Sequence, residues 1–253
     1  MVPFIYIGSI RIASYGLMIA VGLIVANTIA CILRLKNKEN LTDIAILEAY
    51  AIGGALFGAI ALRVITIAKY VNWSYIGEPG FFEAIFLSGL VFYGGLIGAL
   101  LAVIIAGKVH RINAFAFLDE CAFMIPIMHG FGRIGCHLAG CCYGMPYHGP
   151  FAVTFPEDTL GLPGVPLFPV QLTESAILMI LGIILLIRSC KGKTKNNILI
   201  YAMSYSVIRF CLEYIRYDSI RGKFLHLSTS QWISVIIFVL GLVVMVRRHY
   251  RRA

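Results

Sequence analysis

Apolar residues recur along this 253-residue chain in long runs that short polar segments separate. Each run has about 17–25 residues, the length that a helix needs to cross the hydrocarbon core of a bilayer. We expect seven such helices, at about 11–33, 44–68, 84–106, 115–138, 171–189, 197–215 and 230–246. The pattern predicts an all-α integral membrane protein, with residues 1–253 as a single polytopic membrane domain and no attached soluble domain.

Composition supports this class. The chain is 60% hydrophobic and only 13% charged, whereas about a quarter of the residues in a soluble domain are charged. The first apolar run lacks a basic segment before it and a small-residue cleavage site after it. We therefore interpret it as a retained helix and not as a signal peptide.

Basic residues gather on one side of the predicted membrane. Thirteen of the 21 lie in the first, third and fifth loops and at the C-terminus, five lie on the other side, and three lie within spans. The three are Arg63, Arg133 and Arg209. By the positive-inside rule the N-terminus is outside and the C-terminus cytoplasmic. Topology thus accounts for the net charge of +9, which gives no reason to expect nucleic acid as a partner.

The longest polar stretch covers about residues 143–170. It holds six of the nine prolines and has no lysine or arginine. Proline-rich segments of this kind form turns and not long helices. We expect an outer-face loop of turns and short extended pieces.

The stretch from His129 to Gly144 (HGFGRIGCHLAGCCYG) is the most unusual part of the chain. It places Arg133 at the end of an apolar run, where an ionisable residue costs about 2.5–3.5 kcal/mol even on lenient insertion scales. No acidic residue lies within one helical turn of Arg133. Its partner must therefore be an anion from another helix or from a ligand.

Three of the seven cysteines cluster at the end of this stretch, namely Cys136, Cys141 and Cys142. The others stand singly, where cysteine behaves as a small hydrophobe; they are Cys31, Cys121, Cys190 and Cys211. Three interpretations of the cluster remain open: a structural group of thiols, which we favour, a disulfide or redox pair, and a zinc site completed by His137 or His148. The last is the weakest, because the paired CxxC spacing of strong zinc motifs is absent.

A second set of buried charges lies near the end of the sixth run. Arg209, Glu213 and Arg216 share one helical face. They either neutralise one another or leave an arginine for an anionic ligand, with Glu213 orienting the guanidinium group. Gln171 and Glu174 open the fifth run on the same side of the membrane. Arginines that converge at this depth suit a phosphate group, because guanidinium groups match its oxygens in pairs. Residue chemistry alone thus indicates a protein that binds phospholipid headgroups, with a transferase as one candidate activity.

Five motifs, in order, resemble those of the prolipoprotein diacylglyceryl transferase family. They are Tyr15-Gly-Leu-Met, Gly89-Leu-Val-Phe-Tyr93-Gly-Gly-Leu-Ile-Gly98, Gly132-Arg133-Ile-Gly135, Pro169-Val-Gln171-Leu-Thr-Glu174 and Arg209-Phe-Cys-Leu-Glu213-Tyr-Ile-Arg216-Tyr-Asp218. The resemblance implies a multi-pass enzyme of the bacterial plasma membrane. It would move the diacylglyceryl group of phosphatidylglycerol to the lipobox cysteine of a prolipoprotein and release glycerol 1-phosphate. It implies no metal and no soluble cofactor.

The resemblance also assigns roles and shows departures. Arg133 matches the arginine that binds phosphatidylglycerol, Arg209 a second essential arginine, and Tyr15 a required tyrosine. The family's usual catalytic histidine is Tyr93 here, and its asparagine after Arg-x-Gly is Cys136. In the motif over Phe168–Glu174, the family's histidine, serine and tyrosine are replaced by Phe168, Val170 and Thr173.

We hypothesise that His129 supplies the lost base, because it lies one helical turn before Arg133 on the same face. His137, one turn after Arg133, is its rival, and Tyr93 could act as an acid or hold water. The predicted catalytic residues are Arg133, Arg209, Tyr15, His129, Tyr93 and Glu213. The predicted substrate-binding residues are Arg133, Arg209, Arg216, Gln171, Glu174, Cys136 and His137.

Three functions remain open at this point. The first is the family reaction on prolipoproteins. The second is a divergent transferase that keeps the phospholipid donor and uses another acceptor. The third is different chemistry: a membrane thiol oxidoreductase that uses the cysteine cluster, or a lipid-binding protein without catalysis.

Overall fold

A computed structural model of the chain describes residues 2–71, 73–78, 80–81, 83, 91–157, 159–217 and 223–250. Most of these residues are helical, and the rest include three small two-stranded antiparallel sheets. Contacts divide the chain into two compact units. The first unit comprises Met1–Leu33 with Leu118–Ala253, and the second comprises Arg34–Phe117.

The chain begins with a hairpin, which the sequence prediction missed. Strands β1 (Phe4–Ile7) and β2 (Ile10–Ala13) pair through a two-residue turn in which Gly8 has a positive φ of 61°. Two-residue hairpin turns favour glycine for this reason. Helix α1 (Ser14–Lys36) therefore starts three residues later than expected. The apolar residues at the start of the predicted run belong to a strand, where β-branched isoleucine alternates with other residues.

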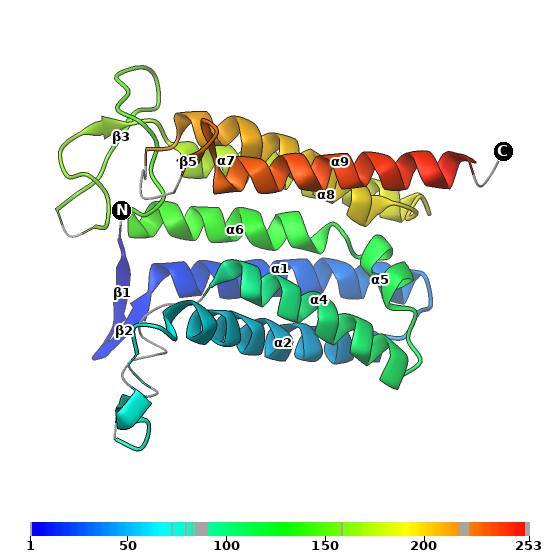
Figure 1. Ribbon diagram of the computed structural model, residues 1–253. Helices are drawn as coiled ribbons and strands as arrows, with labels where there is room; N and C mark the ends of the chain where they lie inside the picture. Colours follow the sequence, from blue (N-terminus) through cyan, green and yellow to red (C-terminus); the bar gives the residue numbers. More distant parts are fainter. Residues whose placement is uncertain are drawn as a thin grey trace. The chain divides into compact units, whose positions relative to one another are not determined.

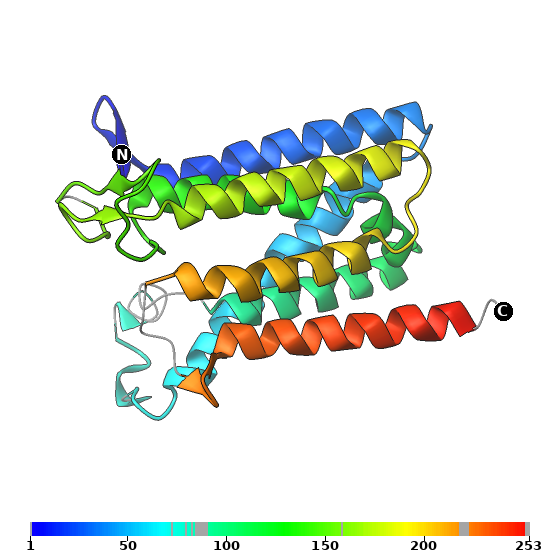
Figure 2. The same ribbon diagram turned by 90° about the horizontal axis from the view of Figure 1, so that it is seen from above.

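The first unit contains most of α1 and four further long helices (Figures 1 and 2). They are α6 (Met124–Ala139), α7 (Val170–Cys190), α8 (Asn197–Leu212) and α9 (Thr229–Tyr250). Helix α6 packs along α7, and α8 packs along α9 and, less extensively, along α7. The apolar side chains of Phe123, Leu178 and Leu185 are fully buried in this unit.

The predicted fourth span, 115–138, is not one continuous helix. It consists of α5 (Ala114–Glu120) and α6, which are bent by 58° across a short break. Pro126 lies in the first turn of α6. Proline lacks the N–H that a helix interior needs, whereas a first turn tolerates it, so Pro126 favours a new helix start at this point.

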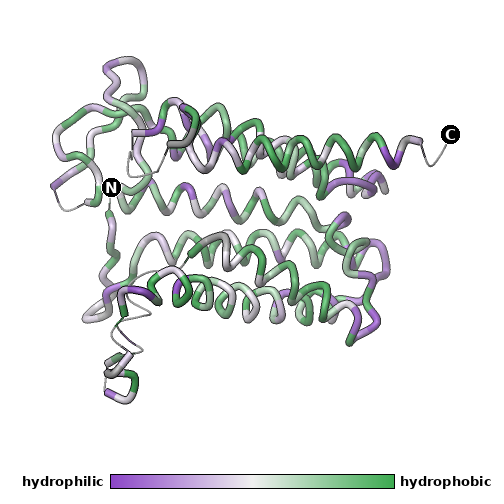
Figure 3. Tube along the Cα trace, in the orientation of Figure 1, coloured by the Kyte–Doolittle hydropathy of each residue, from purple (hydrophilic) through white to green (hydrophobic). Residues whose placement is uncertain are grey.

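Five described helices are long and apolar enough to cross a membrane, and the bent pair α5–α6 would make a sixth. The five are α1, α2 (Thr42–Ile67), α7, α9 and α8 extended to Ile215. Helix α4 (Phe92–Val109) is apolar but shorter, and residues 84–90 of the predicted third span lie outside the described residues. Figure 3 shows the apolar residues along the helices and polar residues at many of their ends. The chain is thus a helical multi-pass membrane protein, while seven spans and the orientation of the termini stay predictions.

In the second unit, α2 and α4 approach closely at glycines. A Cβ atom on Gly58 would lie 2.2 Å from the carbonyl oxygen of Gly94, and one on Gly98 would lie 2.1 Å from that of Gly54. Each helix thus presents a small-xxx-small pair, which lets membrane helices come into backbone contact. The 3₁₀ turn η1 (Trp73–Tyr75) also belongs to this unit.

The segment after α6 forms the predicted cap of turns and short strands. Strand β3 (Val153–Thr154) pairs with β4 (Pro166–Leu167), and Pro146 bridges to Leu167. A further small sheet joins β5 (Lys223–Phe224) to β6 (Leu227–Ser228) just before α9. The turns and short extended pieces predicted for residues 143–170 are present over the described residues, while the outer-face position of this segment stays a prediction.

Candidate active site

Glu174 lies at the centre of a buried ionic cluster in the first unit. It sits in the second turn of α7, near the N-terminal end of the helix, and its side chain is fully removed from solvent. Its Oε2 lies 3.0 Å from Nε of Arg133 on α6 and 3.8 Å from Nη1 of Arg216. Its Oε1 accepts a hydrogen bond of 3.1 Å from the hydroxyl of Tyr205 on α8. Arg133 therefore finds its acidic partner on another helix, as the sequence required.

Arg209 and Glu213 form the second half of the cluster. They make an i,i+4 ion pair, and Nη2 of Arg209 also lies 3.2 Å from Oγ of Ser230. Arg209 interacts electrostatically with both Arg216 and Glu174. Among the described residues, Nη1 of Arg209 is buried without a hydrogen-bond partner. This N–H group is available to an incoming oxygen atom.

The cluster carries one excess positive charge. Three guanidinium groups face two carboxylates, and the side chains of all five residues are at least 85% buried. Arginine stays protonated under such burial. The arrangement therefore favours a ligand with a single negative charge.

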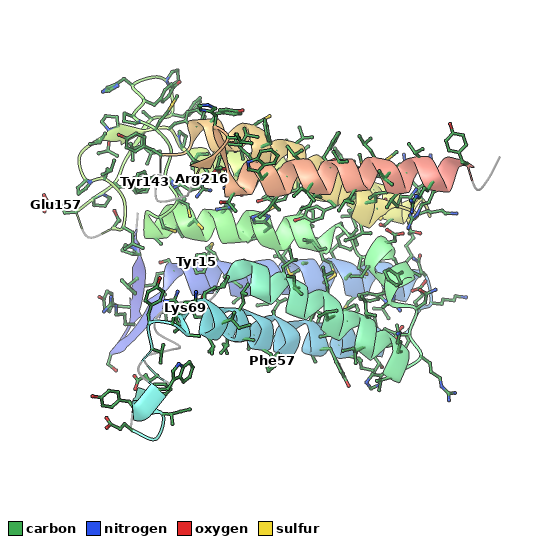
Figure 4. The ribbon with its side chains drawn as sticks, viewed as in Figure 1. Tyr15, Phe57, Lys69, Tyr143, Glu157 and Arg216 are labelled. Atoms are coloured by element: carbon green, nitrogen blue, oxygen red, sulfur yellow. The ribbon has the colours of Figure 1, made fainter. Side chains whose placement is uncertain are left out.

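Arg216 does not share the helical face of Arg209, which corrects the sequence prediction. Helix α8 ends at Leu212, a 3₁₀ turn η2 (Glu213–Ile215) follows, and Arg216 has an extended backbone. It pairs with Gly144, while the N–H of Tyr217 donates to the carbonyl of Tyr143. Figure 4 shows Arg216 and Tyr143 close together where the cap meets the helices. This pairing draws the chain out of the helix, and the side chain of Arg216 then reaches Glu174.

Tyr15 lies at the start of α1, against α6. A Cβ atom on Gly135 would be 3.1 Å from Cα of Tyr15, so the two backbones are nearly in contact. Tyr15 is 44% exposed and lies next to the turn of α6 that carries Arg133 and Cys136. Figure 4 labels it at the same end of the helices as Arg216. The structure thus brings Tyr15 to the cluster, and glycine at 135 is what allows the approach.

The two candidate histidines lie in different surroundings. His129 is 3.8 Å from Oε1 of Glu174, and its ring packs edge-on to Tyr205 at 4.9 Å. His129 and Arg133 therefore approach the same carboxylate, which is consistent with the prediction that they share one helical face. His137 packs against Phe155 of the cap, and its Nδ1 is buried without a hydrogen-bond partner among the described residues. The contacts of His129, and not those of His137, place it in the ionic cluster.

Tyr93 lies in the first turn of α4, in the second unit, and its side chain is outside the described residues. Its role stays a prediction.

The cysteine cluster results from the way in which α6 ends. Gly140 caps the helix in the left-handed region at φ 77°, and the N–H of Cys141 donates to the carbonyl of Cys136. Such a cap turns the chain back over the last helical turn. The sulfur atoms of Cys136, Cys141 and Cys142 consequently lie within 4.8 Å of one another. Gln171 holds the turn, because its Nε2 donates to the carbonyl of Cys141 at 2.9 Å.

Arg216 links the cysteines to the ionic cluster. Hydrogen bonds with Cys136 and Cys141 lower the pKa of the Cys142 thiol, and the nearby Arg216 guanidinium group lowers it further. The hydrogen bonds raise the pKa of Cys141. Of these two thiols, Cys142 therefore has the lower pKa.

Three polar residues of the site were not predicted from the sequence: Tyr201, Tyr205 and Ser230. Tyr205 bonds Glu174, and Tyr201 stacks on Tyr205 with ring centroids 6.0 Å apart. A signal for Tyr205 was present, because it lies four residues before Arg209 and so on the same helical face. Ser230 on α9 is distant in the sequence and gave no such signal.

Comparison with known proteins agrees with the motifs. A sequence model of the family described as prolipoprotein diacylglyceryl transferase matches residues 3–247. The chain belongs to the prolipoprotein diacylglyceryl transferase family. The resemblance inferred from the five motifs is therefore confirmed, and the family is one of enzymes.

Three bacterial relatives illustrate the similarity. A protein of Clostridium perfringens named phosphatidylglycerol–prolipoprotein diacylglyceryl transferase 2 is 36% identical over 241 residues, which cover 92% of this chain and 90% of that protein. The corresponding transferase of Clostridium tetani is 32% identical, with 93% of this chain and 92% of that protein covered. That of Staphylococcus haemolyticus is 31% identical, with coverage of 97% and 87%.

Proposed function

We propose that this protein transfers the diacylglyceryl group of phosphatidylglycerol to the thiol of a prolipoprotein cysteine and releases glycerol 1-phosphate. The names of its relatives specify this donor and this acceptor for those proteins. The observation that carries the proposal is the single excess positive charge of the Arg133, Arg209 and Arg216 cluster. A phosphodiester headgroup carries one negative charge and would neutralise it.

Arg133 and Arg209 are the proposed headgroup ligands. Arg209 Nη1 has no hydrogen-bond partner among the described residues. The guanidinium group of Arg133 is oriented by its ion pair with Glu174. Charge-assisted bonds from arginine to phosphate oxygens are short and strong. The same groups also stabilise the charge that develops on the leaving phosphate, which is the largest effect that a preorganised site provides.

The reaction forms one bond and breaks one. The acceptor thiolate attacks the glyceryl carbon, a C–S bond forms, and the C–O bond to the phosphate breaks with its electron pair left on the phosphate. We assign removal of the thiol proton to His129. Glu174, 3.8 Å from Nε2 of His129, would stabilise the imidazolium ion. Tyr15 would line the site where the glyceryl carbon lies.

An apolar groove between α8 and α9 suits an acyl chain of the donor. Its lining includes Val207, Phe210, Val235 and Phe238. Phe210 directly follows Arg209, so the groove adjoins the proposed headgroup ligand. Burying a methylene group away from water contributes about 0.8 kcal/mol. The acyl chain is already surrounded by lipid before it enters the groove, so the groove would orient the acyl chain more than it would add affinity.

We further propose seven spans, with the N-terminus outside, in the plasma membrane of a bacterium. The C-terminal ends of α6 and α8 and the N-terminal end of α7 carry the cluster. In this topology all three ends face outward, where a translocated prolipoprotein presents its cysteine. The cap over residues 143–170 would then border the entrance for that acceptor.

Genetic complementation tests the function. The wild-type chain should restore growth and lipoprotein modification in a bacterial strain depleted of its own diacylglyceryl transferase. An Arg133→Lys variant should fail, because an ammonium group cannot make the paired bonds of a guanidinium group. Arg11→Lys, at an exposed position of β2, is the matched control and should complement. Failure of the wild-type chain at normal expression would favour another acceptor and overturn the proposal.

A further inference from the structure

We propose that Cys136, Cys141 and Cys142 form a three-sulfur site for a soft metal ion, and that copper(I) fits it best. The proposal does not depend on the transfer reaction. It rests on the positions of the three sulfur atoms, on the scaffold that holds them, and on the charges around them.

The sulfur atoms are close to the spacing that a metal ion requires. They lie within 4.8 Å of one another. A metal–sulfur bond is about 2.3 Å long, so three sulfurs around one ion in a plane are roughly 4.0 Å apart. Side-chain rotations alone can close the remaining gap of less than about 1 Å, because χ1 of cysteine moves the sulfur without moving the backbone.

The backbone around the cluster is fixed on both sides. Gly140 and the bond from Cys141 N–H to the Cys136 carbonyl attach the first two ligands to the end of α6. The buried Gln171 holds the Cys141 carbonyl, and the bond from Tyr217 N–H to the Tyr143 carbonyl fixes the residue after Cys142. A site held in this way loses little conformational entropy when it binds an ion.

The number and the chemical kind of the metal ligands, three cysteine sulfur atoms, favour copper(I). Among the described histidine, cysteine and acidic residues, no fourth ligand joins the three sulfurs. Structural zinc sites almost always have four protein ligands, whereas soft thiolates favour copper(I) without that requirement. Two of the cysteines are only half-buried, which gives an ion access from the cap side.

The surrounding charges favour the metal-bound form. Three thiolates with one copper(I) ion carry two negative charges, and binding releases the thiol protons to solvent. Arg216 bonds to Cys142, and Arg133 interacts with both Cys136 and Cys142. The ionic cluster, with its single excess positive charge, thus offsets part of the negative charge of the site, and a buried anionic centre needs such compensation.

Copper(I) transfer to the purified protein tests the proposal. The reduced, full-length protein in detergent is titrated into the coloured copper(I) complex of bathocuproine disulfonate, and loss of colour reports the copper(I) that the protein takes. We expect one ion per chain for the wild type, and at least a tenfold weaker uptake for Cys136→Ser and for Cys142→Ser. Cys190→Ser alters an exposed cysteine at the other end of α7 and should bind like the wild type.

X-ray absorption of the copper-loaded wild-type protein provides a measurement that needs no variant. We expect three sulfur neighbours around copper(I). No uptake by the wild type, uptake by Cys142→Ser equal to that of the wild type, or a spectrum with fewer than two sulfur neighbours would each overturn the proposal. Copper uptake is compared only for variants that elute from size-exclusion chromatography like the wild type. If no variant does, the X-ray absorption spectrum of the wild-type protein alone tests the proposal.

Discussion

Arg133 Nε and Glu174 Oε2 lie 3.0 Å apart across the contact between α6 and α7, with the carboxylate fully buried. Residues that are 41 positions apart in the sequence thus form the pair that orients the proposed phosphate ligand. Arg216 and His129 approach the same carboxylate from other directions, each at 3.8 Å. Glu174 therefore positions three groups of the proposed reaction at once.

Replacing Glu174 with Gln should damage both stability and activity. The change keeps the shape but leaves three guanidinium groups with a single carboxylate. Breaking a buried ion pair costs about 3–5 kcal/mol, so the thermal unfolding temperature in detergent should fall clearly. Transfer activity should fall more than about tenfold, since roughly 1.4 kcal/mol of lost transition-state stabilisation suffices for that.

Glu157→Gln is the control for that change, because Glu157 is an exposed glutamate in the cap (Figure 4). It should unfold and react like the wild type. Equal unfolding temperatures and activities for the Glu174 and Glu157 variants would show that Glu174 does not hold the cluster together.

Replacing His129 with Ala tests the proposed base. Loss of a general base lowers turnover by about 10²–10⁴-fold, and kcat should fall while KM for phosphatidylglycerol changes little. His148→Ala, at an exposed position of the cap, should keep normal turnover. Steady-state kinetics with phosphatidylglycerol vesicles and a lipobox peptide give both constants. Near-normal turnover of the His129 variant would exclude this residue as the base.

The α2–α4 contact should tolerate no side chain at Gly58. A Cβ atom there meets the Gly94 backbone at 2.2 Å, whereas one on Gly53 meets nothing within 4 Å. Overpacking typically costs about 1–3 kcal/mol, so Gly58→Ala should lower the unfolding temperature. Gly53→Ala should leave it unchanged or raise it slightly, because alanine is the better helix former. A similar effect of both changes on thermal unfolding would contradict the packing described for this unit.

The proposed topology predicts which positions a membrane-impermeant maleimide can reach. In a background with the seven native cysteines replaced by serine, Glu157→Cys should be labelled in intact cells. Lys193→Cys, in the loop between α7 and α8, should be labelled only after permeabilisation. The opposite pattern would invert the orientation inferred from the basic residues.

Sequence patterns located the helices well and their ends less well. The seventh run was expected at 230–246 and α9 covers Thr229–Tyr250, because a long apolar run has few alternatives in a membrane. The hairpin before Ser14 was missed, since its isoleucines extend the apolar run of α1. The break before Met124 was also missed, although Pro126 marks it.

The site was predictable where chemistry was local and unpredictable where it depended on chain reversals. A buried Arg133 without a nearby acid predicted a partner on another helix, and the structure places Glu174 there. The departure of Arg216 from its helix depends on pairing with Gly144, 72 residues earlier in the chain, which no periodicity shows. The sequence held one signal that Cys141 and Cys142 turn back toward Cys136. This signal is Gly140, because a glycine directly after a helix often forms a left-handed cap that reverses the chain.

Mass spectrometry of a lipobox peptide tests the central claim most directly. Purified protein in vesicles of phosphatidylglycerol should add one diacylglyceryl group to the cysteine of the peptide and release glycerol 1-phosphate in equal amount. A peptide with serine at that position, vesicles of phosphatidylethanolamine and the Arg133→Lys variant should each give less than about a tenth of this product. The account predicts a thioether-linked diacylglyceryl peptide; an unmodified peptide with folded wild-type protein would contradict it.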